Sequence, residues 1–72
     1  MILDKINYLV EGIVQDLIQF VMEDYGMKLE DAMDIVYKSK IFEKLNDYET
    51  HLYSESSSYV YEFLKEEGIV NE

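Results

Sequence analysis

The sequence predicts an all-α fold: residues 1–72 form a single helical domain, a small bundle of about four helices with one long N-terminal amphipathic helix. Apolar residues recur at steps of three and four along most of the chain, which is the spacing of one helix face. Proline is absent, and Gly26, Ser39 and Gly68 stand where these patterns stop or restart. A chain of 72 residues has room for one domain only.

The first predicted helix spans about residues 3–25. Its apolar positions form a heptad-like row that comprises Leu3, Ile6, Val10, Ile13, Leu17 and Phe20. Gly26 stands where a left-handed C-terminal cap is expected. At 1.5 Å per residue such a helix is about 34 Å long, whereas a compact chain of this size is only about 29 Å across. We therefore expect the shorter helices to leave part of its apolar face uncovered.

A second helix is predicted over residues 29–38, where apolar residues recur at i, i+3, i+4, i+7 and i+8 and acidic residues crowd the first turns. Ser39 is expected to cap a short third helix with Ile41, Phe42 and Leu45 turned inward. Residues 46–54 are expected to form a loop anchored in the core by Leu52 and Tyr53.

The fourth predicted helix begins after Ser54 or Ser56, either of which is a suitable cap, and ends near Glu67, before Gly68. Its predicted apolar face consists of Tyr59, Val60, Phe63 and Leu64.

The charge disfavours nucleic acid and acidic membrane surfaces as partners. The chain has 16 acidic and 6 basic residues, a net charge of −10, and phosphate recognition needs a basic face. Residues 47–72 alone contain seven acids and one lysine, whereas residues 28–46 contain four of each. No stretch approaches 18 consecutive apolar residues, and the first residues do not form a basic segment followed by an apolar run. We expect a cytoplasmic protein that does not cross a membrane.

The side chains that carry catalysis or bind metals are scarce, and we expect no enzyme, no cofactor and no metal site. Cysteine is absent, and His51 is the one histidine. It lies in the predicted loop without the spacing of a ligand pair, so an ordinary surface hydrogen bond is the simpler interpretation. Adjacent acids such as Glu66 and Glu67 lie at helix ends, where solvated charge is expected rather than a catalytic pair.

Two surfaces are candidates for partners. The acidic C-terminal third is rich in tyrosine, and aromatic residues rimmed by acids suit an interface with a basic protein. The predicted partner surface comprises Tyr53, Tyr59, Tyr61, Glu62 and Glu66. The uncovered apolar face of the first helix would suit a homodimer. The predicted dimer seam comprises Leu3, Ile6, Val10, Ile13 and Leu17.

The segments 49–56 and 59–67, about a quarter of the chain, resemble short bacterial all-helical proteins of uncharacterised function, and residues 22–25 and 29–32 extend the similarity. Some such proteins are encoded beside ADP-ribosyltransferase-type toxins, so the resemblance implies an antitoxin role. The function expected first is therefore a small acidic protein-binding module, accessory or antitoxin-like. The alternatives are a nucleic-acid mimic that inhibits a DNA-binding protein and, ranked lower, a helix-turn-helix regulator built on residues 28–46.

Overall fold

The computed structural model describes residues 2–68 and the side chains from residue 4 onward. This part of the chain is all-α, as predicted. It contains α1 (Ile2–Tyr25), α2 (Leu29–Lys38), α3 (Lys40–Leu45) and α4 (Ser57–Glu66), with two short 3-10 turns, η1 (Tyr48–Thr50) and η2 (Leu52–Ser54), between α3 and α4.

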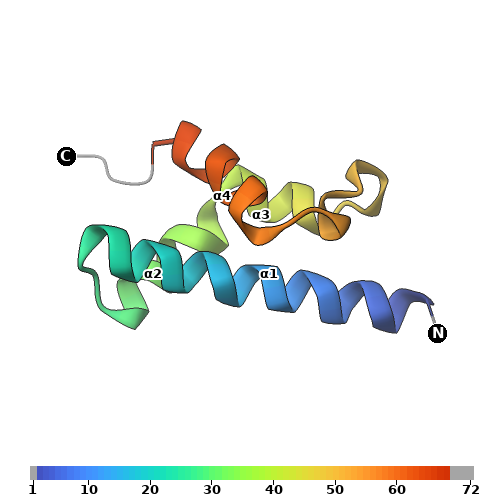
Figure 1. Cartoon of the computed structure of the whole chain (residues 1–72), viewed down its shortest axis with the longest axis horizontal. Helices are drawn as coiled ribbons and strands as arrows, with labels where there is room; N and C mark the ends of the chain where they lie inside the picture. The colour runs from blue at the N-terminus through green and yellow to red at the C-terminus, as the bar shows by residue number, and fades with distance from the viewer. Residues whose placement is uncertain (1, 69–72) are drawn as a thin grey trace.

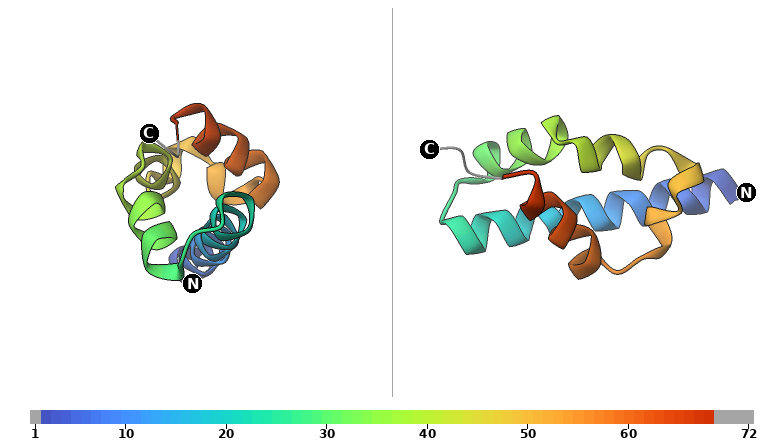
Figure 2. Two further views of the ribbon diagram at one scale, coloured as in Figure 1. Left: turned by 90° about the vertical axis from the view of Figure 1, so that its left-hand side faces the viewer. Right: turned by 90° about the horizontal axis from the view of Figure 1, so that it is seen from above.

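The long helix α1 sets the shape of the molecule, which measures 40 × 20 × 18 Å. α2 and α3 run back beside α1 in the opposite direction, and α4 crosses the other flank of α1 (Figures 1 and 2). Viewed end-on, α1, the α2–α3 arm and α4 stand on three sides of one core (Figure 2). No helix in the described part of the chain is both long enough and apolar enough to span a membrane.

Local signals place the chain reversals. Gly26 adopts a left-handed conformation (φ +64°), and the N–H of Met27 donates to the carbonyl of Met22 at 3.2 Å, so α1 ends in the expected glycine cap. Ser39 caps α3 by accepting from the N–H of Phe42 at 3.1 Å, while its hydroxyl donates to the carbonyl of Val36 at 2.7 Å. One buried serine therefore both ends α2 and begins α3.

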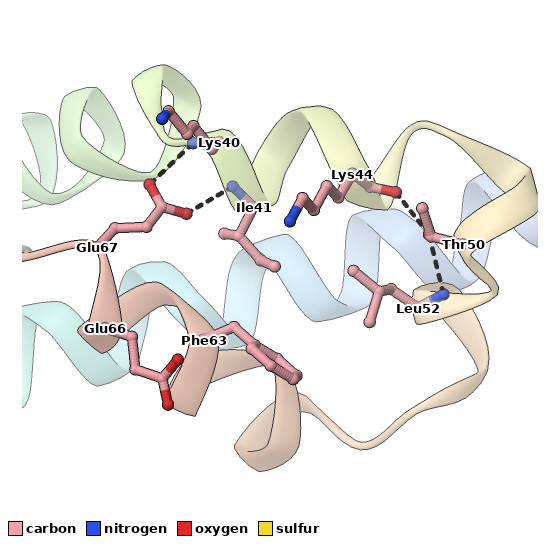
Figure 3. A pocket seen from close by; sticks show the side chains of 8 residues that line it. All are labelled: Lys40, Ile41, Lys44, Thr50, Leu52, Phe63, Glu66 and Glu67. Atoms are coloured by element: carbon pink, nitrogen blue, oxygen red, sulfur yellow. Dashed lines mark hydrogen bonds between the residues drawn. The ribbon is translucent and has the colours of Figure 1, made fainter.

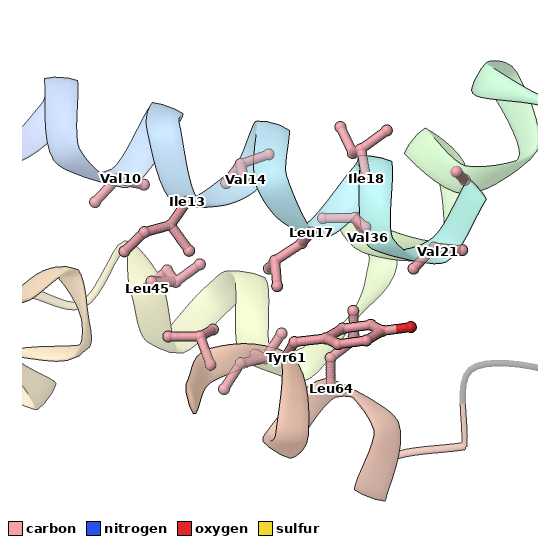
Figure 4. Close-up of a cluster of buried hydrophobic side chains, with 13 residues drawn as sticks. Val10, Ile13, Val14, Leu17, Ile18, Val21, Val36, Leu45, Tyr61 and Leu64 are labelled. Atoms are coloured by element: carbon pink, nitrogen blue, oxygen red, sulfur yellow. The ribbon is translucent and has the colours of Figure 1, made fainter. Parts of the chain in front are cut away.

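The core lies along the inner face of α1 and is filled from all four helices (Figure 4). The buried apolar side chains are Val10, Ile13, Val14, Leu17, Ile18, Val21, Ala32, Val36, Ile41, Leu45, Val60, Tyr61 and Leu64.

The predicted dimer seam is wrong at three of its five positions. Val10, Ile13 and Leu17 are 5%, 6% and 0% exposed within the single chain, so they are not available to a second copy. Ile6 is partly buried against the same core, and the side chain of Leu3 lies outside the described part of the structure. The homodimer itself stays a prediction.

The predicted seam is covered because α2, α4 and the segment between α3 and α4 together pack against α1. Residues 48–54 fold into η1 and η2, and η2 contacts α1, placing Leu52 and Tyr53 against the edge of the core. Thr50 ties η1 to the end of α3, since its hydroxyl proton is shared between the carbonyl oxygens of Lys44 and Asp47, at 2.7 and 2.9 Å. The inner face of α1 is thus enclosed by α2 on one flank and by η2 and α4 on the other.

Candidate protein-binding surface

The helix α4 is fixed in place at both ends. Ser56 is its N-cap, with the N–H of Tyr59 donating to its hydroxyl oxygen at 3.1 Å. Ser57, the first helical residue, donates its hydroxyl proton to the Asp16 carboxylate of α1 at 2.6 Å. At the other end the Glu67 carboxylate accepts from the N–H groups of Lys40 and Ile41 at 2.9 and 2.7 Å. These bonds tie α4 to α1 and α3, so its outward face is presented on a rigid base.

The buried face of α4 differs from the predicted one. Val60, Tyr61 and Leu64 are buried, whereas Tyr59 and Phe63, expected in the core, are 48% and 37% exposed. The predicted face would have run through residues 59, 60, 63 and 64, and the observed one is rotated by about one residue toward Tyr61. This rotation lets the tyrosine bury its ring while its hydroxyl reaches a polar partner.

Tyr61 is consequently not part of any exposed partner surface, which corrects its predicted role. It is only 6% exposed. Its ring packs on Phe20 with centroids 5.0 Å apart, and its hydroxyl donates to the Asp24 carboxylate at 2.7 Å. Burial, together with the hydrogen bond to Asp24, raises the pKa of the Tyr61 hydroxyl above its ordinary value. Tyr61 is a structural link between α4 and α1.

The outward face of α4 bears four residues at i, i+3, i+4 and i+7, which lie in one row along a helix. We name this row the α4 stripe: Tyr59, Glu62, Phe63 and Glu66, all exposed. The rings of Tyr59 and Phe63 meet edge to face with centroids 5.1 Å apart. Lys65 pairs with Glu62 at 3.3 Å, and its ammonium lies 5.0 Å from the Tyr61 ring centroid. The stripe is therefore an aromatic pair flanked by carboxylates.

Tyr53, the remaining predicted partner residue, lies in η2 and not on α4. It is partly buried and packs edge to face with Tyr48 at 6.3 Å and against His51 at 5.8 Å between ring centroids. His51 has a positive φ of 58° and joins η1 to η2, so its position serves the turn. Within the described residues, no group of three potential ligands that could hold a metal ion is present.

A groove of about 470 Å³ lies beside the α4 stripe, between α3 and α4 (Figure 3). We name it the α3–α4 groove. Ile41 and Leu52 line it together with Phe63 of the stripe. Lys40 and Lys44 of α3 stand on the side opposite Glu66, and Glu67 reaches across one end to the backbone of Lys40 and Ile41. Sequence reasoning missed this groove because it depends on the packing of α3 against α4. Its trace in the sequence is the pair Lys40 and Lys44, one helical turn apart in the electrically neutral stretch.

Comparison with known proteins found no family model, no curated protein and no solved structure that matches this chain.

Proposed function

We propose that this chain is a small acidic protein-binding module, accessory or antitoxin-like in role, which binds a partner with a basic surface through the α4 stripe. The observation that carries the proposal is the exposure of Tyr59 and Phe63 as a packed aromatic pair between Glu62 and Glu66. Aromatic side chains at the centre of a polar rim are the common composition of protein interfaces.

The aromatic residues and the carboxylates of the stripe would have different roles in binding. Burial of partly exposed aromatic rings against a partner lowers the free energy of the complex. Residues of this type commonly supply most of the binding energy of an interface. The carboxylates, within a chain of net charge −10, attract a basic surface over several ångströms and raise the association rate. The buried face of α4 and its three anchoring contacts supply the rigidity that such a surface needs.

The proposed surface differs from the one predicted from the sequence in its aromatic residues. Phe63 takes the place of Tyr61, which is buried, and Tyr59 stays exposed. Glu62 and Glu66 are exposed on α4 and complete the proposed surface.

Affinity capture with matched variants tests the proposal. The wild-type chain, a Tyr59→Ala/Phe63→Ala variant and a Glu62→Gln/Glu66→Gln variant would be immobilised in parallel and exposed to a lysate of the native cell. A Glu30→Gln/Asp31→Asn variant is the control, since it removes two charges from α2, away from the stripe. We expect a partner that the wild type and the control retain and that both stripe variants lose.

Binding kinetics with the captured partner then separate the two roles. We expect Glu62→Gln/Glu66→Gln to slow association and to weaken its dependence on salt, and Tyr59→Ala/Phe63→Ala to speed dissociation. A partner bound equally well by the stripe variants and the control would show that the interface lies elsewhere, and the proposal would be wrong.

A further inference from the structure

The α3–α4 groove carries opposite charges along its two sides with apolar side chains between them (Figure 3). Lys40 and Lys44 occupy successive turns of α3, and Glu66 of α4 stands across the groove from them. Residues four apart on a helix lie about 6 Å from each other on one face. The α3 side of the groove therefore presents two positive charges with helical spacing, and the α4 side presents the carboxylate of Glu66.

The lysines of this groove are not neutralised within the described part of the chain. The salt bridges found there join Lys38 to Asp34 and Lys65 to Glu62. Glu67, the carboxylate nearest to α3, is directed at the backbone N–H groups of Lys40 and Ile41 rather than at an ammonium group. Two unpaired ammonium groups in a chain of net charge −10 mark a local site for negative charge.

The floor of the groove adds an apolar requirement. Leu52 of η2, Phe63 of α4 and Ile41 of α3 line it, and the Lys44 side chain extends toward it (Figure 3). Ile41 is buried, Leu52 is partly buried and Phe63 is exposed. A ligand that fits must bring apolar side chains to this floor and carboxylates to α3.

We propose that the docking element of the partner is an amphipathic helix that lies in the α3–α4 groove. Its apolar row would contact Leu52 and Phe63, its acidic edge would pair with Lys40 and Lys44, and its basic edge would lie along Glu66. This inference rests on the proposed function and adds the chemistry of the partner. A helix satisfies these requirements because its own i, i+4 spacing matches that of Lys40 and Lys44, while its opposite edge can meet Glu66.

Two synthetic helical peptides, stapled so that both are equally helical, provide the probe. Both carry an apolar i, i+3, i+4, i+7 row and lysines along one edge, and the other edge carries two glutamates in the first peptide and two glutamines in the second. The net charge of the protein favours the glutamine peptide, because it is the more positive of the two. A preference for the glutamate peptide must therefore come from local positive charge on the protein.

Fluorescence anisotropy at about 150 mM salt, where long-range attraction is screened beyond about 8 Å, measures both affinities. We expect the wild type to bind the glutamate peptide about fivefold more tightly, the gain typical of two rim ion pairs. Lys40→Gln/Lys44→Gln should abolish or reverse this preference. Lys5→Gln/Lys28→Gln, which removes the same charge from the beginnings of α1 and α2, should preserve it.

Several outcomes would overturn the inference. One is equal or weaker binding of the glutamate peptide by the wild type, and another is an identical loss of preference in both lysine variants. If peptide binding still depends on Glu62 and Glu66 in either case, the proposed function stands and only the groove assignment falls. A dimer in sedimentation experiments that Lys40→Gln/Lys44→Gln abolishes would show that a second copy occupies the groove, which would also overturn the assignment to a partner helix.

Discussion

The Glu67 carboxylate is the sharpest test of how this fold closes, because one side chain joins the end of α4 to the beginning of α3. Its two oxygens accept from the N–H groups of Lys40 and Ile41 at 2.9 and 2.7 Å. These are among the N–H groups of the first turn, which have no partner within their own helix. The negative charge also lies at the positive end of the helix dipole.

We expect Glu67→Gln to lower the free energy of unfolding by about 1.5 kcal/mol. The variant keeps one acceptor oxygen, loses the negative charge and turns an amide N–H₂ group toward a backbone donor. Loss of a helix cap typically costs about 1 kcal/mol, and hydrogen bonds to a charged group are worth about 1.5–3 kcal/mol, a value that partial exposure lowers. For a domain of this size the change corresponds to a decrease in Tm of roughly 6–12 °C.

Glu66→Gln is the matched control, because Glu66 is the adjacent exposed acid and the same charge is removed. Urea unfolding followed by circular dichroism at 222 nm would compare the two variants with the wild type. We expect Glu66→Gln to change the free energy of unfolding by less than about 0.5 kcal/mol, as is usual for exposed sites. Equal destabilisation by the two substitutions would show that the bridge between α4 and α3 is not responsible, since losing one acid from a chain of net charge −10 should by itself reduce repulsion.

Three further predictions test the core, α1 and the link to Asp24. Ile13→Asp should unfold the chain, at a cost of more than about 3 kcal/mol. Leu9→Asp, at a more exposed position, should leave it folded. An Ile13→Asp protein that is folded in circular dichroism and monomeric in sedimentation would instead favour the original dimer seam. Gly12→Ala should raise stability by about 1 kcal/mol, because an added Cβ meets no atom within 4 Å; destabilisation in thermal melts would indicate a close neighbour such as another chain. Tyr61→Phe should lose about 1 kcal/mol at neutral pH. The pKa of Tyr61 is raised in the folded state, so its hydroxyl contributes stability that is fully present below about pH 10, the pKa of a tyrosine in the unfolded chain, and is lost as the pH rises further. Above about pH 10 the free energy of unfolding should therefore fall more steeply in the wild type than in Tyr61→Phe.

Much of the helical layout can be predicted from the sequence because its signals act over a few residues. Helical periodicity marks α1 from the spacing of its own residues. The caps at Gly26, Ser39 and Ser56 each depend on backbone groups within the same or the adjacent turn. The bounds of α2 coincide with the predicted residues 29–38 for the same reason. Local hydrogen bonding and backbone sterics decide such features wherever the helix later packs.

The candidate site was only partly predictable. The acidic, tyrosine-rich composition of the last third pointed to α4, and Tyr59, Glu62 and Glu66 do lie on one exposed face. Whether Tyr61 or Phe63 would face outward could not be read from a helix in which both lie near the boundary of the apolar face. In the observed orientation of α4, Tyr61 turns inward and its hydroxyl bonds to Asp24, which lies 37 residues away in the sequence.

The sequence by itself therefore determined the all-α class, the long amphipathic helix and the uneven charge, since these follow from composition and from interactions between near neighbours. The tertiary structure decided which apolar residues were left exposed. Val10, Ile13 and Leu17 are covered where α2, α4 and η2 pack against α1. The α3–α4 groove lies between two helices that Glu67 joins at one end. Both results depend on contacts between residues far apart in the chain, and helical periodicity contains no information about which faces will meet.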